Sequence, residues 1–208
     1  MLSPVRTTVE DLVANLVALK RDLITSDIVS RCVAATPISV EALKDYIWWR
    51  DEFYTRNLIY RDELFEVMTI CWKPGQKTAI HTHNGQLGWM TVPQGEVAVE
   101  NYHHERCNAP ENQNVVNIDC LGGATEIHLE KIGSLQCNES SGLAIVDKLQ
   151  SIHRIVNTDK ADAGCVSLHI YSKPFDSCIA FDLERQRCFR RVLSYFSRFG
   201  KVEAEETH

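Results

Sequence analysis

From about residue 63 onward, apolar side chains recur at every second position in short segments. Turn residues separate these segments, such as Lys-Pro-Gly at 73–75, Asn-Gly at 84–85 and Pro-Gln-Gly at 93–95. A period of two is typical of strands, and many short strands without intervening helices favour an antiparallel sandwich or barrel. We expect strands at 64–72, 77–82, 86–93, 95–102, 115–120, 124–132, 142–147, 152–156, 164–172, 178–183 and 188–196.

Two helical signals precede these strands. Residues 8–23 carry apolar side chains at three- and four-residue spacings, with Thr7 or Thr8 as the N-cap. Residues 39–49 begin at a potential Ser cap and continue with a shorter pattern of the same period. We therefore predict one domain over 1–208, in which a helical annex at 1–50 packs outside a β-barrel at 51–200.

The composition excludes several classes of protein. The 208 residues are 44% hydrophobic and 24% charged, which is ordinary for a globular chain. The net charge of −6 comes with no basic stripe, so we expect no nucleic-acid partner. No apolar run is long enough for a signal peptide or a bilayer span, so we expect no membrane association and a cytoplasmic location. None of the eight cysteines forms a CxxC pair, and most should be free thiols.

His81 and His83 stand one residue apart at the end of a predicted strand. Residues i and i+2 of a strand project from the same face, so both imidazoles point to the same side. Two imidazoles on one face can chelate one transition-metal ion. The pair alone is equally consistent with histidines held by hydrogen bonds or solvent, so a metal site needs a third ligand.

The spacing around this pair resembles the first motif of the cupin family of small barrels. Gly75, His81, His83, Gly88 and Gly95 fall at the positions of that motif. Most cupins carry a glutamate ligand where this chain has Gly88, and glycine has no side chain with which to coordinate. A ligand set of two histidines and one carboxylate is therefore not available from this motif.

The second cupin motif places a lone histidine in a later hairpin, followed four residues on by Asn. Gly142, His153 and Asn157 fall at the matching offsets, although Lys148 and Gln150 replace the usual Pro and Gly. This resemblance makes His153 the candidate for the third ligand.

Residues 164–172 contain a further candidate site. Ser167, His169 and Tyr171 alternate with Leu168 and Ile170, so the three polar groups share one face of the strand. They could form a hydrogen-bonded chain, or they could be the polar outer face of an ordinary strand.

Together with YTRN at 54–57 and the histidine motif, the run VSLHIYSKPFDSCIAFD at 166–182 resembles the cysteine dioxygenase family of thiol dioxygenases. The resemblance covers roughly residues 45–200. It implies oxidation of L-cysteine with O2 to cysteine sulfinate at one Fe(II) per chain. It also implies three groups of site residues: the iron ligands His81, His83 and His153; the substrate-binding Arg56 and Tyr54; and the catalytic Tyr171, His169 and Ser167.

Three departures qualify this resemblance. In the mammalian members a cysteine stands at the position of Gly88 and bonds to the tyrosine, so Tyr171 is expected to be an unmodified phenol, as in bacterial-type members. The family's Tyr-Ser-Pro-Pro run has Lys173 in place of the first proline, which leaves the conformation of the loop at 172–174 open. Related mercaptopropionate dioxygenases carry Gln at the position of Arg56 and an Arg near position 178, where this chain has Cys178.

Other functions remain open at the level of sequence. One is a thiol dioxygenase of the 3-mercaptopropionate type. Another is a zinc or nickel cupin that acts as a hydrolase or isomerase, because three histidines and an open position also build hydrolytic zinc sites. A third is a cupin that only binds a ligand. The oligomeric state is also open.

Overall fold

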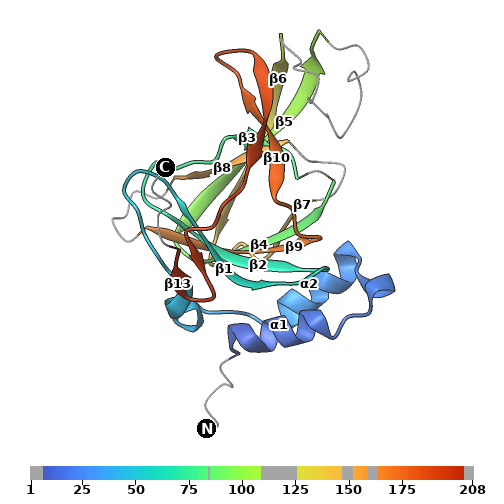
Figure 1. Cartoon of the computed structure of the whole chain (residues 1–208), viewed down its shortest axis with the longest axis vertical. Helices are drawn as coiled ribbons and strands as arrows, with labels where there is room; N and C mark the ends of the chain where they lie inside the picture. Colours follow the sequence, from blue (N-terminus) through green and yellow to red (C-terminus); the bar gives the residue numbers. More distant parts are fainter. Residues whose placement is uncertain (1–6, 84, 109–125, 147–151, 159–163, 204–208) are drawn as a thin grey trace.

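The computed structural model describes residues 7–83, 85–108, 126–146, 152–158 and 164–203. Most of the described residues lie in two β-sheets, and short helices at the N-terminus pack on one of them (Figure 1). No helix in these ranges is long and apolar enough to cross a membrane. The predicted fold class, dominated by β-structure with N-terminal helices packed outside, is confirmed.

One sheet has seven strands in the order β13-β12-β1-β2-β9-β4-β7. Its central strands are antiparallel and buried on both faces, because one face meets the helices and the other meets the second sheet. The bounds are β1 Thr55–Arg61, β2 Glu66–Trp72, β4 Leu87–Gln94, β7 Ala144–Val146, β9 Cys165–Ser172, β12 Ser197–Arg198 and β13 Lys201–Val202.

The other sheet has six strands in the order β11-β10-β3-β8-β5-β6. The β5–β6 and β10–β11 hairpins run beyond the sandwich, away from the helices (Figure 1). The bounds are β3 Ile80–His81, β5 Glu96–Arg106, β6 His128–Asn138, β8 His153–Asn157, β10 Ser177–Asp182 and β11 Arg187–Val192.

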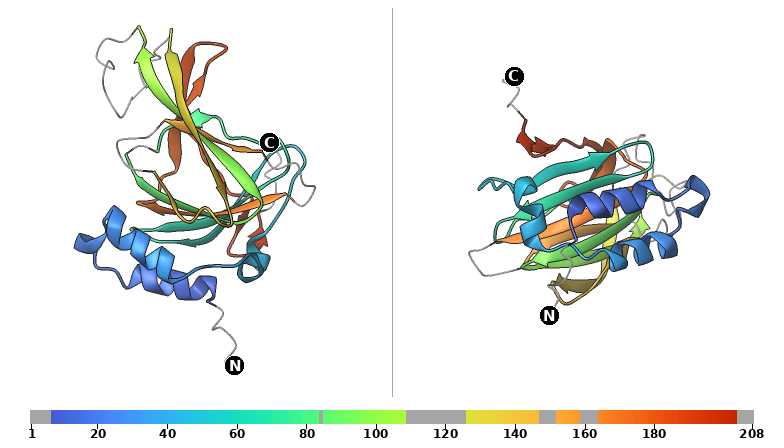
Figure 2. Two further views of the ribbon diagram at one scale, coloured as in Figure 1. Left: turned by 180° about the vertical axis from the view of Figure 1, so that it is seen from behind. Right: turned by 90° about the horizontal axis from the view of Figure 1, so that it is seen from below.

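The helices cover the outer face of the seven-stranded sheet (Figure 2). Helix α1, Val9–Val17, begins with a capping box in which Thr8 and Asp11 bond reciprocally. Its Leu12 and Leu16 are fully buried against the sheet. Helix α2 spans Ser26–Ala35, and two 3₁₀ segments, η1 and η2, span Arg21–Leu23 and Val40–Tyr46.

The two sheets enclose a second core. Met68 and Ile70 of β2 pack with Val97 and Val99 of β5 and with Ile155 of β8, so side chains of both sheets interdigitate. The inner faces therefore meet, and any side chain on these faces near the open end of the sandwich can contribute to a shared site.

Several predicted boundaries are wrong. The helix expected over 8–23 ends at Val17, and α2 was not predicted, although the Thr25 side chain caps it by accepting from the Ile28 N–H. Residues 40–46 are 3₁₀ rather than α-helical. The strand expected at 188–196 ends at Val192. The strand expected at 115–120, and the start of the one at 124–132, lie outside the described residues.

Strand β1 was also missed, because its first residues are polar. Thr55 and Asn57 are completely buried, and each is satisfied by hydrogen bonds: the Thr55 hydroxyl donates to the Trp48 carbonyl, and Ser197 donates to Asn57 at 2.9 Å. Side-chain hydrogen bonds thus make a buried strand from a sequence that lacks apolar alternation.

Candidate metal centre

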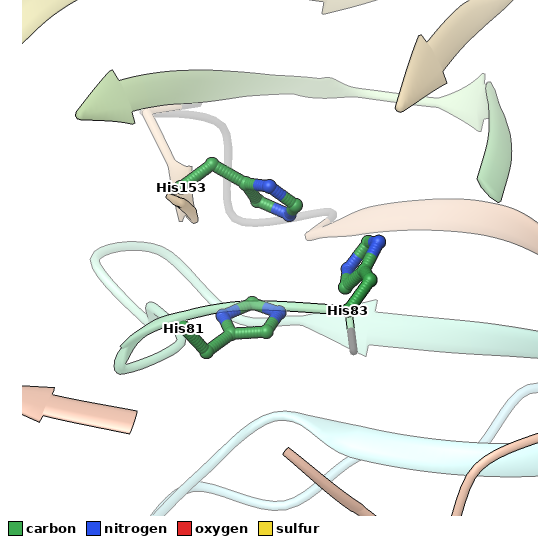
Figure 3. A group of neighbouring side chains, drawn as sticks. All are labelled: His81, His83 and His153. Atoms are coloured by element: carbon green, nitrogen blue, oxygen red, sulfur yellow. The ribbon is translucent and has the colours of Figure 1, made fainter. Parts of the chain in front are cut away.

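The pairing register of the six-stranded sheet brings two of the three candidate histidines together. His81 of β3 stands directly opposite His153 of β8, so their side chains leave the same face of the sheet side by side. His83 follows two residues after His81, just beyond the end of β3. The strand that ends there turns the third ring toward the other two (Figure 3).

The three rings form a compact cluster. Their centroids are 5.3 Å apart for His81–His83, 4.8 Å for His81–His153 and 4.6 Å for His83–His153. One ring nitrogen from each lies within 4.8 Å of the other two, a separation that one ion could bridge. Within the described ranges this is the only group of three or more His, Cys, Asp or Glu with such geometry.

Burial keeps these rings neutral. Desolvation is the main cause that lowers the pKa of His81 to about 4, and it lowers the pKa of His83 and of His153 well below the ordinary value, with mutual repulsion among the rings adding to the effect. Neutral imidazole is the form that binds metal ions.

The hydrogen bonds around the rings also fit a metal. The Nδ1 of His81 lies 2.9 Å from the Ala79 carbonyl, which can only accept, so Nδ1 carries the proton and Nε2 keeps its lone pair for a ligand. The Nδ1 atoms of His83 and His153 are buried and have no hydrogen-bond partner among the residues that the structure describes. Three neutral, converging rings, of which His83 and His153 are buried and His81 is half-buried, suit a transition-metal ion and make a poor hydrogen-bonded core.

Opposite this cluster, β9 carries a chain of hydrogen bonds on its inner face. Ser167 Oγ lies 2.7 Å from His169 Nε2, and His169 Nδ1 lies 3.1 Å from the Tyr171 hydroxyl. Trp72 donates its indole N–H to Ser167 at 2.8 Å. All three members of the chain are buried, so of the two arrangements that the sequence left open, the structure has the hydrogen-bonded chain and not the polar outer face.

The distances favour one direction for the protons of this chain. The Ser167 hydroxyl has two possible acceptors, His169 Nε2 at 2.7 Å and the Ile70 carbonyl at 3.4 Å, and the shorter separation favours donation to His169 Nε2. Burial lowers the pKa of His169 to about 3, so the ring is neutral and its one proton sits on Nδ1, facing the Tyr171 oxygen. The Tyr171 proton is then free to point elsewhere. Burial also raises the pKa of Tyr171, which keeps the phenol protonated.

Gly88 lies directly across from Tyr171 on β4. A Cβ at this position would stand 3.2 Å from two carbons of the Tyr171 ring and 3.5 Å from His83 Nδ1. Because Gly88 has no side chain, the Tyr171 ring can lie close to the backbone of β4 and to the His83 ring. The neighbouring peptide bond between Ser172 and Lys173 is cis, which is the conformation that the sequence left open.

Arg56 and Tyr54 approach the cluster from β1 and the segment before it. The Arg56 guanidinium forms an ion pair at 3.4 Å with Glu66, whose side chain is completely buried, and donates to the Ser194 carbonyl at 3.1 Å. Tyr54 stacks on Trp72 with ring centroids 4.8 Å apart. Arg56 is thus an inward-facing residue, with a partner that the sequence analysis did not consider.

A small cavity of about 40 Å³ joins these residues to His81. Because it touches both a potential ligand and a cation, a bound metal and an anionic group could share it. Its lining includes Tyr54, Arg56, His81, Tyr171, Phe175 and Cys178.

Among the described residues, the remaining histidines do not join the cluster. His103 and His104 lie on β5, where His104 is buried and His103 is exposed, and His128 begins β6. His208 lies outside the described residues.

A family model described as cysteine dioxygenase type I matches residues 1–184. The chain belongs to the cysteine dioxygenase type I family. Cysteine dioxygenase type 1 of Rattus norvegicus is 29% identical over 148 residues, which are 71% of this chain and 64% of the rat protein. The human protein is 28% identical over the same shares. The match thus spans less than two thirds of the length of these relatives.

Solved structures with a similar fold include TT1209 from Thermus thermophilus, with a TM-score of 0.40 and 17% identity over 64% of this chain and 95% of that one. A protein with a double-stranded β-helix domain from Klebsiella pneumoniae has a TM-score of 0.38 and 14% identity over 73% and 94%. At these values neither likeness bears on the chemistry of the site.

Sequence reasoning missed two charged residues near the cavity, Glu66 and Arg191. Glu66 could have been found, because it shares a strand face with Met68, Ile70 and Trp72 and is the only charged side chain of that face. Arg191 could not, because it lies in the run RCFRRV, in which three arginines look equivalent until the register is known.

Proposed function

We propose that this member of the cysteine dioxygenase family oxidises L-cysteine with O2 to cysteine sulfinate, using one Fe(II) per chain. The observation that supports the proposal most is the convergence of three neutral imidazoles, one of which, His81, lines a cavity together with Arg56 and Tyr171. In the overall reaction the sulfur loses four electrons, O2 gains them, and both oxygen atoms end on sulfur.

His81, His83 and His153 would hold the iron. All three are neutral donors, so a bound ion would keep its full positive charge. Ferrous iron bound there would supply dioxygen activation and would favour the thiolate form of the substrate. We infer that substrate binding releases the thiol proton.

Arg56 and Tyr54 would orient the substrate. A planar guanidinium suits a carboxylate, and Arg56 keeps unused N–H donors after its bonds to Glu66 and Ser194. A fixed carboxylate would fix the direction of the thiol, so the two groups would set the geometry in which sulfur meets oxygen.

Tyr171 would act as a hydrogen-bond donor in the site. The Ser167–His169 chain favours a phenol whose proton is free, and burial keeps that proton on the oxygen. A donor fixed in a site that excludes water can stabilise charge that develops on the reacting oxygens or on the carboxylate. Ser167 and His169 would hold this donor in position.

A 3-mercaptopropionate-type thiol dioxygenase is the second candidate. The presence of Arg56 and of Cys178, instead of Gln and Arg at those positions, favours cysteine over that substrate. The cytoplasmic location expected from the sequence stays a prediction, as does the absence of nucleic-acid and membrane partners.

One experiment separates the candidates. The purified protein is loaded anaerobically with Fe(II), mixed with L-cysteine or 3-mercaptopropionate, and exposed to oxygen while dissolved oxygen and sulfinate are measured. We expect oxygen uptake with one sulfinate formed per O2 consumed, fastest with cysteine. Turnover of ester or sugar substrates by the Zn(II)-loaded protein would favour the hydrolase or isomerase. Binding of a ligand without turnover under every condition would favour a binding module.

A further inference from the structure

The cavity beside His81 is lined by a second arginine, Arg191, in addition to Arg56. Arg191 belongs to the six-stranded sheet, whereas Arg56 belongs to the seven-stranded sheet. Arg191 of β11 stands directly across from Cys178 of β10, and the neighbouring pair on the same face, Ala180 and Phe189, is in register with His81. Arg191 therefore projects from the histidine-bearing face of the six-stranded sheet. Arg56 projects from the inner face of the seven-stranded sheet, and both line the same small cavity.

The two arginines differ in how far their charges are already compensated. Arg56 is 11% exposed, pairs with the fully buried Glu66, donates to Ser194 and lies over the Tyr195 ring at 5.0 Å. The Glu66 carboxylate also accepts a hydrogen bond from the Tyr195 hydroxyl at 2.5 Å, which holds it in place. Arg56 and Glu66 thus form a fixed and nearly neutral pair.

Arg191 has no such partner. In the described ranges its guanidinium forms no ion pair and no side-chain hydrogen bond, although its side chain reaches the cavity. It lines the cavity beside His81 and projects from the sheet face that carries this candidate ligand. Arg191 is therefore the uncompensated positive charge at the mouth of the site.

The position of Arg191 also suits an entry route. Arg191, Arg56, Tyr54 and Leu193 line both the small inner cavity and a larger outer cleft of about 900 Å³. The inner cavity of about 40 Å³ has room for only a few atoms beside the histidines, so part of a bound amino acid must lie where the two spaces meet. That junction is flanked by the two guanidinium groups.

We propose that Arg191 is a substrate-binding residue, and that the substrate's carboxylate is held between Arg191 and the Glu66-anchored Arg56. The inference rests on the proposed thiol dioxygenase function and adds to it a second residue that would select thiols with a carboxylate. Glu66 is a positioning residue in this arrangement, because it fixes Arg56 and leaves Arg191 to supply the net charge. Charge-assisted hydrogen bonds from two arginines to one carboxylate would select strongly against a thiol that lacks the anionic group.

The test is the affinity of the iron-loaded protein for thiols in the absence of oxygen, measured by isothermal titration calorimetry. We compare the wild type with Arg191→Gln and with Arg190→Gln. Arg190 is the matched control, because it is the adjacent arginine of the same strand, points to the opposite face and donates to Ser177 at 2.8 Å. The side chain of Arg191 is exposed, so the substitution should not affect folding.

We expect Arg191→Gln to raise the Kd for L-cysteine by about 10- to 100-fold, which is the range for losing a charged hydrogen-bond partner. Arg190→Gln should stay within twofold of the wild type. The Kd for 2-aminoethanethiol, which keeps the thiol and the amine but lacks the carboxylate, should not respond to either substitution. An unchanged Kd for cysteine in Arg191→Gln, or equal losses for both thiols, would overturn the proposal.

This measurement is independent of turnover, so it separates two kinds of failure. If the wild type consumes oxygen with cysteine and Arg191→Gln binds cysteine normally, only the role of Arg191 is lost. If the wild type consumes no oxygen with any thiol, the proposed function fails, whatever Arg191 binds.

Discussion

The two faces of β9 are equally buried and differ in almost every other respect. On the face toward the helices, Leu168 and Ile170 pack in an apolar core with α1 and β2. On the face toward the second sheet, Ser167, His169 and Tyr171 form a linked set of polar groups opposite three histidines. Burial on the first face removes apolar surface from water, whereas burial on the second fixes protonation states. The outer face should therefore govern stability and the inner face chemistry.

The largest difference between substitutions at the inner face and at the outer face is expected in the iron content of the protein. Changing His153 to Ala removes one of three neutral donors and leaves two, which cannot hold the ion firmly. We expect the iron content to fall from about one atom per chain to almost none. Elemental analysis after loading and desalting measures it.

The matched control is His104→Ala, which removes a buried histidine outside the cluster. It should keep the full iron content. Full occupancy in His153→Ala, or equal loss in both variants, would remove the basis for treating the three histidines as one site.

A substitution on the outer face should have the opposite pattern. Leu168→Ala leaves a cavity under the helices, and large-to-small changes at such positions cost about 2–5 kcal/mol of stability. We expect a lower midpoint of urea unfolding but an unchanged iron content and an unchanged KM for cysteine in the folded protein. If kinetic constants change as much as stability, the two faces are not separable.

Lowering the pH should destabilise the protein through the histidines of the inner face and not through the apolar residues of the outer face. Burial holds the pKa of His81 at about 4 in the folded chain, below its ordinary value of 6.5, so the unfolded chain binds a proton first as the pH falls. The stability that this ring contributes is complete above 6.5 and is lost toward pH 4. For the metal-free protein we expect His81 alone to account for a loss of about 2 kcal/mol between pH 7 and pH 5.

Urea unfolding at the two pH values measures this loss in the wild type and in His81→Gln. The variant should lose about 2 kcal/mol less than the wild type over the same interval. Leu168→Ala should lose as much as the wild type, because it removes no titrating group. Carboxylates such as Glu100 stay charged throughout this pH interval. Some desolvation raises the pKa of Glu100, but its hydrogen bonds and ion pairs outweigh this and lower the pKa to about 2. An equal loss in wild type and His81→Gln would show that this ring titrates normally.

The sequence predicted which residues of β9 share a face better than it predicted the elements of the N-terminal part of the chain. The alternation of Ser167, His169 and Tyr171 with leucine and isoleucine depends on local geometry alone, and a strand preserves it wherever the strand packs. Helix α2 and strand β1 were missed because their stability comes from tertiary contacts: Val29 and Val33 pack on a distant sheet, and Asn57 bonds to Ser197.

The same distinction explains what was missed in the site. His81 and His83 are neighbours in sequence, so their shared face was predictable, and His153 was found through its resemblance to a known motif. Arg56 and Arg191 are 135 positions apart by their numbers, and only the packing of the two sheets shows that they line one cavity. Side chains that meet across a sandwich leave no local pattern in the sequence.

The smallest expected effect concerns the last member of the chain on β9. Tyr171→Phe removes one hydroxyl and keeps the ring that packs against His83 and Phe175, so the fold and the iron content should stay as in the wild type. If the free phenol proton stabilises the reacting oxygens, kcat should fall about tenfold while the anaerobic Kd for cysteine changes little. Ser167→Ala should give a smaller fall in the same direction, because the tyrosine then loses its orientation and keeps its proton. A fall that appears in the Kd and leaves kcat unchanged would assign the hydroxyl to substrate binding, and the inner face of β9 would then contribute to affinity and not to the chemical step.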